Sequence, residues 1–155
     1  MKLKKSHLFV LVSAAAFTWP VHLNAAERSL QFSELPEVVQ KAAREIVHDA
    51  KVLKVIEEKE KTEFYTVEYE GRGGRKFEVE ISPAGKVLES GELIAVAAAP
   101  EAARKVIEEK TKTFTWKKVI KATHEGQTVY VVKFDRGGDD EGQFTVSDKG
   151  KVISE

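Results

Sequence analysis

Cysteine is absent from this chain of 155 residues. Its absence excludes disulfides, thiolate nucleophiles, cysteine-based metal sites and attachment of a lipid to a leader cysteine. No charge of one sign dominates either, because 25 basic residues balance 25 acidic ones. The chain therefore lacks the basic excess with which proteins bind nucleic acid or an anionic membrane. Without covalent or metal crosslinks, the fold has to depend on its hydrophobic core.

Motifs for catalysis are also missing from the sequence. Beyond the first 26 residues there are two histidines, His48 and His124, and they do not have the spacing of a ligand pair on a helix. No serine stands in a nucleophile-elbow motif. The glycine-rich segment 71–74 lies between two alternating stretches and not before a helix, so it predicts a hairpin turn and not a phosphate loop. The sequence therefore predicts a protein that is not an enzyme and needs no cofactor.

The first 26 residues have the three parts of a secretory signal peptide. Three lysines are followed by an apolar run over 8–19 and by small residues over 23–26. The apolar run is too short to span a bilayer comfortably, which disfavours the alternative of an uncleaved membrane anchor. The sequence predicts a periplasmic or secreted protein with no stable membrane anchor after cleavage. Without the leader lysines, 22 basic residues face 25 acidic ones.

After this leader the chain repeats itself, and the repeat is the strongest signal in the sequence. Leu35-Pro36-Glu37 returns as Ala99-Pro100-Glu101, 64 positions later. What recurs is core spacing and turn residues, and no set of reactive side chains recurs with them. The predicted units are residues 27–90 and 91–155. Two further matches are 65 positions apart: the strand pattern over 65–69 returns over 130–134, and Gly-Lys-Val at 85–87 returns at 150–152.

Each unit is predicted to hold one helix followed by strands. Apolar residues from Leu35 to Val47 follow helical spacing, which predicts a helix of about 14 residues capped by Ser33. The strands alternate apolar and polar side chains, as expected of an antiparallel sheet covered on one side. The predicted fold is α+β, two tandem repeats, each one helix packed on an antiparallel sheet of about four strands. The predicted strands are 52–58, 63–70, 76–81 and 86–89, then 116–121, 127–135, 143–147 and 151–153.

The region between the units is predicted to be an ordered joint. It comprises residues 90–91 and 93–98. Because residues 93–96 are apolar, the joint is expected to pack against both units. The sequence leaves open whether the two sheets join edge to edge into one larger sheet or pack separately.

Both units resemble the PepSY-like family, in particular its β-lactamase-inhibitor-like branch. The residues that carry the resemblance are the Leu-Pro-Glu-Val helix start at 35–38, the Tyr-x-Val-x-Tyr strand at 65–69 and the Gly-Lys-Val turn at 85–87, with their second copies. It covers about residues 33–155. The resemblance implies a helix on a four-stranded sheet, twice, in an exported, non-catalytic bacterial protein. Members of this group are associated with inhibiting or chaperoning secreted hydrolases, and no functional residue is transferred from them.

Three aromatic residues are the candidate anchors of a protein partner. Phe64 is out of phase with the strand pattern of 65–69, so it is expected on the uncovered side of the sheet. Phe114 and Trp116 share parity at a strand start, and exposed aromatics are common binding anchors. Arg72 and Arg75 are expected to form the polar rim. The alternative is that the two sheets cover each other and bury the aromatics.

A weaker alternative is a calcium site in an acidic loop. Asp135, Asp139, Asp140 and Glu141 offer oxygen ligands, although their spacing is not that of an EF-hand, and a solvated loop tip is the simpler interpretation. The pair Glu57-Glu58 is likewise expected on a solvated face. The sequence therefore predicts an exported binding module for a protein of the envelope or medium. The resemblance to the PepSY-like family implies that this partner is a hydrolase, which the module inhibits or chaperones. The alternative is a periplasmic small-ligand or cation-binding sensor.

Overall fold

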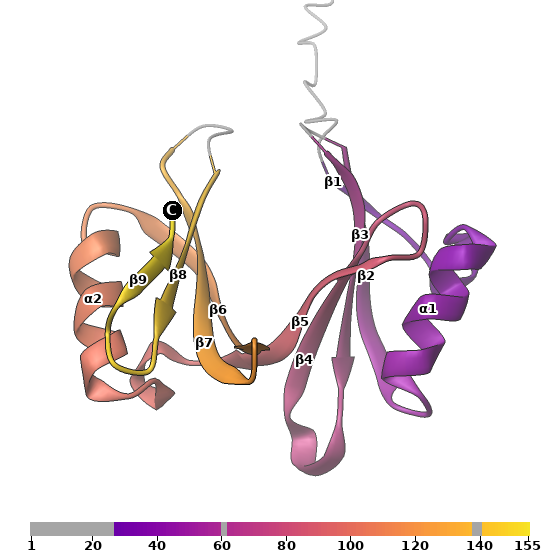
Figure 1. Ribbon diagram of the computed structural model, residues 1–155. Coiled ribbons are helices and arrows are strands. Elements are labelled where there is room, and N and C mark those ends of the chain that lie inside the picture. The colour runs from indigo at the N-terminus through magenta and orange to yellow at the C-terminus, as the bar shows by residue number, and fades with distance from the viewer. Residues whose placement is uncertain (1–26, 60–61, 138–140) are drawn as a thin grey trace, which may run out of the picture.

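Nine antiparallel strands form one continuous sheet, in the order in which they occur along the chain. The computed structural model (Figure 1) describes residues 27–59, 62–137 and 141–155, and of residues 116 and 117 only the backbone. The leader predicted over residues 1–26 lies outside the described residues. The strands are β1 (Glu27–Ser29), β2 (Lys51–Lys59), β3 (Glu63–Glu70), β4 (Lys76–Ile81), β5 (Val87–Ile94), β6 (Thr115–His124), β7 (Gln127–Asp135), β8 (Glu141–Ser147) and β9 (Val152–Ser154).

Two helices lie on the outer sides of the bent sheet, one beside each half (Figure 1). They are α1 (Glu37–Val47) and α2 (Glu101–Thr111). In the described part of the chain, neither is long and apolar enough to cross a membrane. Short 3-10 turns precede each helix, at Phe32–Glu34 and Val96–Ala98, and a third joins β3 to β4 at Arg72–Gly74.

The first helix begins later than the sequence predicted. Ser33 lies in the preceding 3-10 turn, and Pro36 occupies the cap position of α1, which has 11 residues. The reason is the proline, because the residue before a proline is driven out of the helical region. Leu35 accordingly has ψ 146°, an extended conformation that ends the turn and separates it from the helix.

The helices bury one stripe each against the sheet. Val39, Ala43 and Val47 of α1 are buried at intervals of four, and α2 repeats the arrangement with Ala103 and Ile107. Each stripe meets the alternate strand residues that point toward it, so there are two hydrophobic clusters. The sheet residues in the first cluster are Val55, Tyr65, Val67, Val79 and Ile81, and those in the second are Val119, Tyr130, Val132, Phe134, Phe144 and Val146.

The predicted fold class, two tandem repeats each with a helix on its own four-stranded sheet, is wrong, because the strands form a single nine-stranded sheet. The difference arises at β5, which runs on to Ile94, past the predicted end at residue 89. Residues 91–94 pair with residues 119–122 of β6 and join the two halves. The joint expected over 90–91 and 93–98 therefore begins as strand, and the unit boundary proposed after residue 90 falls inside β5.

The face of the sheet opposite the helices is bent inward, and we call it the concave face (Figure 1). Its members are identified by strand register, because residues directly opposite each other in an antiparallel pair point to the same side. Thr66 pairs with Ile56 and with Glu80, and Lys118 pairs with Lys133. The same rule adds Glu58, Phe64, Glu68, Glu78, Glu89, Ile120, Val131 and Gln143.

Candidate functional site

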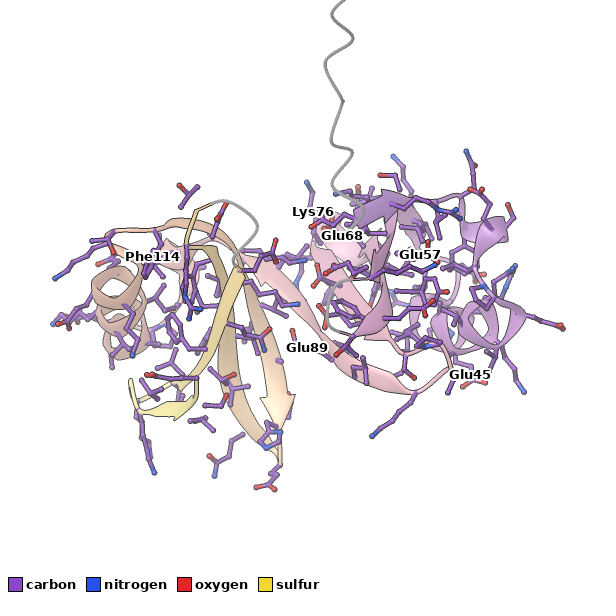
Figure 2. All side chains as sticks on the ribbon, turned by 90° about the horizontal axis from the view of Figure 1, so that it is seen from above. Glu45, Glu57, Glu68, Lys76, Glu89 and Phe114 are labelled. Carbon is purple, nitrogen blue, oxygen red and sulfur yellow. The ribbon has the colours of Figure 1, made fainter. Side chains whose placement is uncertain are left out.

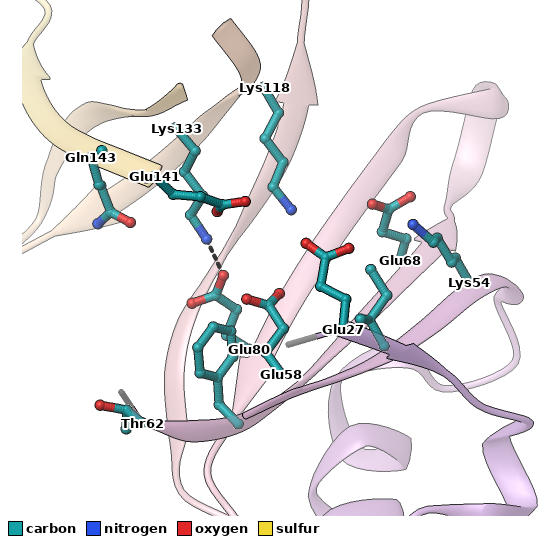
Figure 3. Close-up of a pocket in the computed structure, with 13 residues that line it drawn as sticks. Glu27, Lys54, Glu58, Thr62, Glu68, Glu80, Lys118, Lys133, Glu141 and Gln143 are labelled. Carbon is teal, nitrogen blue, oxygen red and sulfur yellow. Dashed lines mark hydrogen bonds and ion pairs between the residues drawn. The ribbon is translucent and has the colours of Figure 1, made fainter. Parts of the chain in front are cut away.

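A hollow of about 510 Å³ lies on the concave face, between strands of the two halves (Figure 3). One wall belongs to β1–β4 and the other to β6–β8, so the hollow exists only because the sheet bends. Its volume is in the range typical of binding sites. The lining residues are Glu27, Lys54, Ile56, Glu58, Thr62, Phe64, Glu68 and Glu80 on the first wall, and Lys118, Lys133, Glu141, Gly142 and Gln143 on the second.

Three carboxylates form an acidic cluster at the floor of the concave face. One oxygen each of Glu78, Glu80 and Glu89 lies within 4.8 Å of the others. The β4–β5 register explains the arrangement, because Glu80 is directly opposite Glu89 and Glu78 is the next residue on the same face. Glu78 is only 1% exposed. Carboxylates are rarely buried to this extent unless they are paired.

Two lysines from the other half of the sheet provide that pairing. Lys118 Nζ lies 2.5 Å from Glu78 Oε2. Lys133 Nζ donates a hydrogen bond to Glu80, marked in Figure 3, and lies 3.6 Å from Glu78 Oε1 and 4.0 Å from Glu89 Oε1. The lysines stand on β6 and β7 and the carboxylates on β4 and β5, so these ion pairs connect the two halves of the sheet.

The acidic cluster has the oxygen ligands of a cation site, but it already holds ammonium groups. A metal ion would have to displace Lys133 from three carboxylates, and Lys118 from one. Among the described residues, two buried oxygens, Glu78 Oε1 and Glu89 Oε1, accept no hydrogen bond. The arrangement therefore supports binding of a group that brings hydrogen-bond donors better than binding of a bare cation.

Two carboxylates of the concave face, Glu58 and Glu89, have pKa values above the usual value for glutamate. Burial raises the pKa of Glu58, and the nearby charges of Glu80 and Glu27 raise it further. Burial likewise raises the pKa of Glu89, against the lowering effect of Lys133. For Lys133, burial acts to lower the pKa, but Glu80, Glu78 and Glu89 outweigh it and hold the pKa above its usual value. The carboxylates of this face thus repel one another at neutral pH.

Replacing Glu58 by Gln is expected to raise the melting temperature at pH 7. The folded-state pKa of Glu58 is raised, so its ionisation at neutral pH costs stability, and that cost disappears as pH falls through the folded-state pKa. The amide oxygen of the new glutamine would keep the acceptor for the Thr66 hydroxyl, now 3.4 Å from Glu58 Oε1. The gain in stability over the unchanged protein at pH 7 should shrink toward pH 4. Thermal unfolding at both pH values measures it, and an equal or lower stability at pH 7 would contradict the assignment.

The predicted aromatic anchors occupy different places. Phe64 is half-buried and lines the hollow, on the side of the sheet without helices. Phe114 precedes β6 and packs against the second hydrophobic cluster, beside α2 (Figure 2), with its ring 5.1 Å from that of Phe134, and it is not among the residues that line the hollow. The backbone of Trp116 is opposite Phe134 in the β6–β7 pair, and its side chain lies outside the described part. A binding role for these residues stays a prediction.

The two arginines of the predicted rim are exposed at the connection between β3 and β4. Neither Arg72 nor Arg75 is among the residues that line the hollow. Arg75 is held by Glu92, to which its Nε donates a hydrogen bond of 2.6 Å, and its guanidinium lies 5.2 Å from the centre of the Phe77 ring. The hydrogen bond and charge of Arg75 hold the pKa of Glu92 below its usual value.

Of the four predicted calcium ligands in the acidic loop, the structure describes two, Asp135 and Glu141. Asp139 and Asp140 lie outside the described residues. Asp135 Oδ1 accepts a hydrogen bond of 2.6 Å from the backbone N–H of Gly137. Glu141 pairs with Asp135 in the β7–β8 register and lines the hollow. A calcium site in this loop stays a prediction.

Sequence reasoning missed the charged residues that line the hollow, with the exception of Glu141. Glu58 was expected on a solvated face, but it is half-buried, and its neighbour Glu57 is buried beside the hydroxyl of Tyr65. The signal available was the run of acidic residues on the polar side of adjacent strands. It could not reveal the site, because the matching Lys118 and Lys133 come from strands in the other half.

Comparison with known proteins identifies similar architectures but no family. No family model and no curated protein matches the chain. Among solved structures, a DUF2874 family protein from Bacteroides ovatus is similar at 13% identity over 77% of this chain and 84% of that one, with a TM-score of 0.48. A Bacteroides eggerthii protein, provisionally described as periplasmic, is similar at 15% identity over 76% and 85%, with a TM-score of 0.49. A BLIP-like protein from Bacteroides fragilis is similar at 16% identity over 76% and 82%, with a TM-score of 0.45.

Proposed function

We propose that this protein is an exported, non-catalytic module that binds a protein partner through its concave face. The observation that carries the proposal is the hollow between the two halves, which presents the side chain of Phe64 together with charged groups on a sheet face free of helices. The leader pattern of residues 1–26 supports export to the periplasm or the medium.

The shape of this face favours a protein partner. A bent sheet offers a broad surface, and the hollow provides a recess in which a protruding partner side chain loses its contact with water. Such recessed contacts supply most of the affinity of protein interfaces, whereas total area supplies little. Side chains around the recess, among them Ile56 and Thr66, are buried and therefore hold the surface in one shape.

The partner that we propose is a hydrolase of the cell envelope or the medium, which this module inhibits or chaperones. Support comes from the resemblance of the repeated motifs to the β-lactamase-inhibitor-like branch of the PepSY-like family. An inhibitor would cover the active-site entrance of its target, and a chaperone would cover a surface exposed before folding is complete. Activity of the captured partner, measured with and without the module, distinguishes the two roles.

Replacing Phe64 by Ala is expected to weaken partner binding at least about tenfold, as is typical of an anchor side chain that loses its contacts in a recess. The immobilised protein would be exposed to envelope and secreted fractions of its source, and the captured protein purified and titrated against both variants. Stability should change little, because Phe64 belongs to neither hydrophobic cluster.

Val38 offers the matched control for this experiment. It is an apolar residue, 47% exposed, on α1 and therefore on the side of the sheet opposite the hollow. A Val38→Ala variant should bind the partner as the unchanged protein does. Equal loss of binding in both variants, or a large drop in the melting temperature of Phe64→Ala, would contradict binding through the concave face.

A further inference from the structure

We infer that the hollow accepts an arginine side chain of the partner. This inference rests on the proposed function, since it names the chemistry of the partner group that enters the same hollow. Three features of the described residues support it. They are the excess of carboxylates around the hollow, the position of the Phe64 ring opposite Glu58, and the buried oxygens of Glu78 and Glu89 that accept no hydrogen bond.

Negative charge is in excess around the hollow. Five glutamates and three lysines line it, and the buried Glu78 and Glu89 add two carboxylates at the floor. The two lysines of the second wall, Lys118 and Lys133, are already paired with Glu78 and Glu80 of the acidic cluster. Because these lysines are engaged there, a cationic group of a partner would be attracted to the carboxylate of Glu58 on the first wall.

Glu58 is the carboxylate of the first wall that is best placed for this group. Among the described residues, its one hydrogen bond is the long contact of 3.4 Å from the Thr66 hydroxyl. The next acidic residue on the wall, Glu68, is directly opposite Lys54 in the β2–β3 register, so a cation is already close to it. Glu58 has Phe64, and not a cation, directly opposite it in the β2–β3 register.

The pairing of Phe64 with Glu58 selects a guanidinium among cations. A guanidinium is planar, so it can stack on an aromatic ring while its N–H groups form a fork on a carboxylate. An ammonium group would satisfy the charge but has no flat face to stack. Phe64 and Glu58 are directly opposite on β3 and β2 and line the same hollow, which places a ring and a carboxylate side by side.

The donors of Lys118 and Lys133 satisfy only part of the acidic cluster at the floor of the hollow. Glu78 is almost completely buried, and its Oε1 and the Oε1 of Glu89 accept no hydrogen bond among the described residues. Their cluster reaches the hollow through Glu80, which lines it. A guanidinium seated between Glu58 and Glu80 would bring five N–H donors to this carboxylate-rich region.

The test is a titration of the isotope-labelled protein with N-acetyl-arginine amide, followed by amide chemical shifts. We expect saturable shifts in β2, β3 and β7, with a dissociation constant in the millimolar range, as for a single side chain. N-acetyl-lysine amide should bind more weakly, and the neutral isostere N-acetyl-citrulline amide should produce no saturable shift. Absence of saturation with the arginine compound up to about 50 mM would overturn the inference, as would equal binding of the citrulline compound.

Two variants separate specific binding from general attraction. Glu58→Gln should weaken binding of the arginine compound at least about fivefold, since it removes a charge-assisted fork. Glu45→Gln removes the same charge from an exposed position of α1, remote from the concave-face residues Glu68 and Glu89 (Figure 2), and should leave binding unchanged. Equal effects of the two variants would mean that only the net charge matters and would also overturn the inference.

Two further measurements identify other occupants. Calcium chloride that shifts the same amides, in the absence of any effect of the arginine compound, would assign the hollow to a cation instead. Self-association seen by light scattering and abolished by Glu58→Gln would assign the hollow to a second copy of the chain.

The two experiments together distinguish failure of the arginine inference from failure of the proposed function. If the arginine compound does not bind but partner capture is still lost in Phe64→Ala, the arginine inference is refuted and the proposed function stands. The reverse pattern, binding of the arginine compound with partner capture unchanged in Phe64→Ala, would refute protein binding through the concave face and leave only a hollow that binds arginine.

Discussion

Replacing Lys133 by Met is expected to lower the free energy of unfolding by about 3–5 kcal/mol, because Glu80 and Glu89 lose their ammonium partner and Glu78 keeps only Lys118. Lys133 is the shared partner of Glu78, Glu80 and Glu89, and its own side chain is only 13% exposed. Methionine fills a similar volume, so the loss of charge and not a cavity dominates the effect. Thermal unfolding at pH 7 should show a drop in melting temperature of roughly 10–20 °C.

The pH dependence of the Lys133→Met variant tests the cause. Without the ammonium group, the pKa values of the acidic cluster rise in the folded state, so the folded state takes up protons more readily than the unfolded chain. The deficit relative to the unchanged protein should therefore shrink as the pH is lowered from 7 toward 4. A deficit that stays constant over this range would indicate lost packing and not unpaired charge.

Two comparisons complete this experiment. Lys105 forms an ion pair of 2.7 Å with Glu101 on α2, where both side chains are largely exposed, and Lys105→Met should change stability by less than about 1 kcal/mol. Adding Glu80→Gln to Lys133→Met should recover part of the lost stability, because it removes one of the unpaired carboxylates. No recovery in the double variant would contradict a direct interaction between Glu80 and Lys133.

Replacing Gly91 by Val is expected to destabilise the protein by about 3 kcal/mol, at the upper end of the cost of overpacking. Gly91 lies in β5 where this strand begins to pair with β6. A Cβ at this position would come within 2.5 Å of the carbonyl oxygen of Lys121 and 2.6 Å of Ile120 Cγ2. The oxygen belongs to the backbone of β6, so the clash is relieved only if the two strands separate.

The neighbouring residue provides the control for Gly91. Ser90→Val places the same side chain at an exposed position of β5 and should change stability by less than about 0.5 kcal/mol. Urea unfolding of both variants measures the difference. If Gly91→Val also unfolds in two steps, the two halves have become independent, as expected when their shared pairing is lost. Unchanged stability of Gly91→Val would show that the contact between β5 and β6 is looser than described.

Most individual elements could be predicted from the sequence. Alternation of side chains located β3, β4 and β7 to the residue or within one residue, because a half-buried strand has a period of two. Helical spacing located the stripe of α1, although the start was wrong because Pro36 forces its predecessor out of the helix. The first strand, over residues 27–29, carries no such signal, since all three of its residues are exposed.

The candidate site was much less predictable. The alternation of side chains along β3 was enough to place Phe64 on the side of the sheet without helices. Such a prediction needs only the sequence of the strand to which the residue belongs. Phe114 looked equivalent by parity, but it precedes the strand and stacks on Phe134. A rule based on alternation fails where the strand has not yet begun.

What the sequence determined by itself is local: periodicity, turns, and which side of a strand each residue occupies. These properties follow from steric and hydrophobic preferences over a few neighbouring residues. What only the tertiary structure decided is how the halves meet. The pairing of β5 with β6 made one sheet where two were expected, and its bend brought Lys118 and Lys133 to Glu78 and Glu80, 40 and 53 positions away. Contacts over such separations depend on the packing of the whole chain, and no local pattern encodes them.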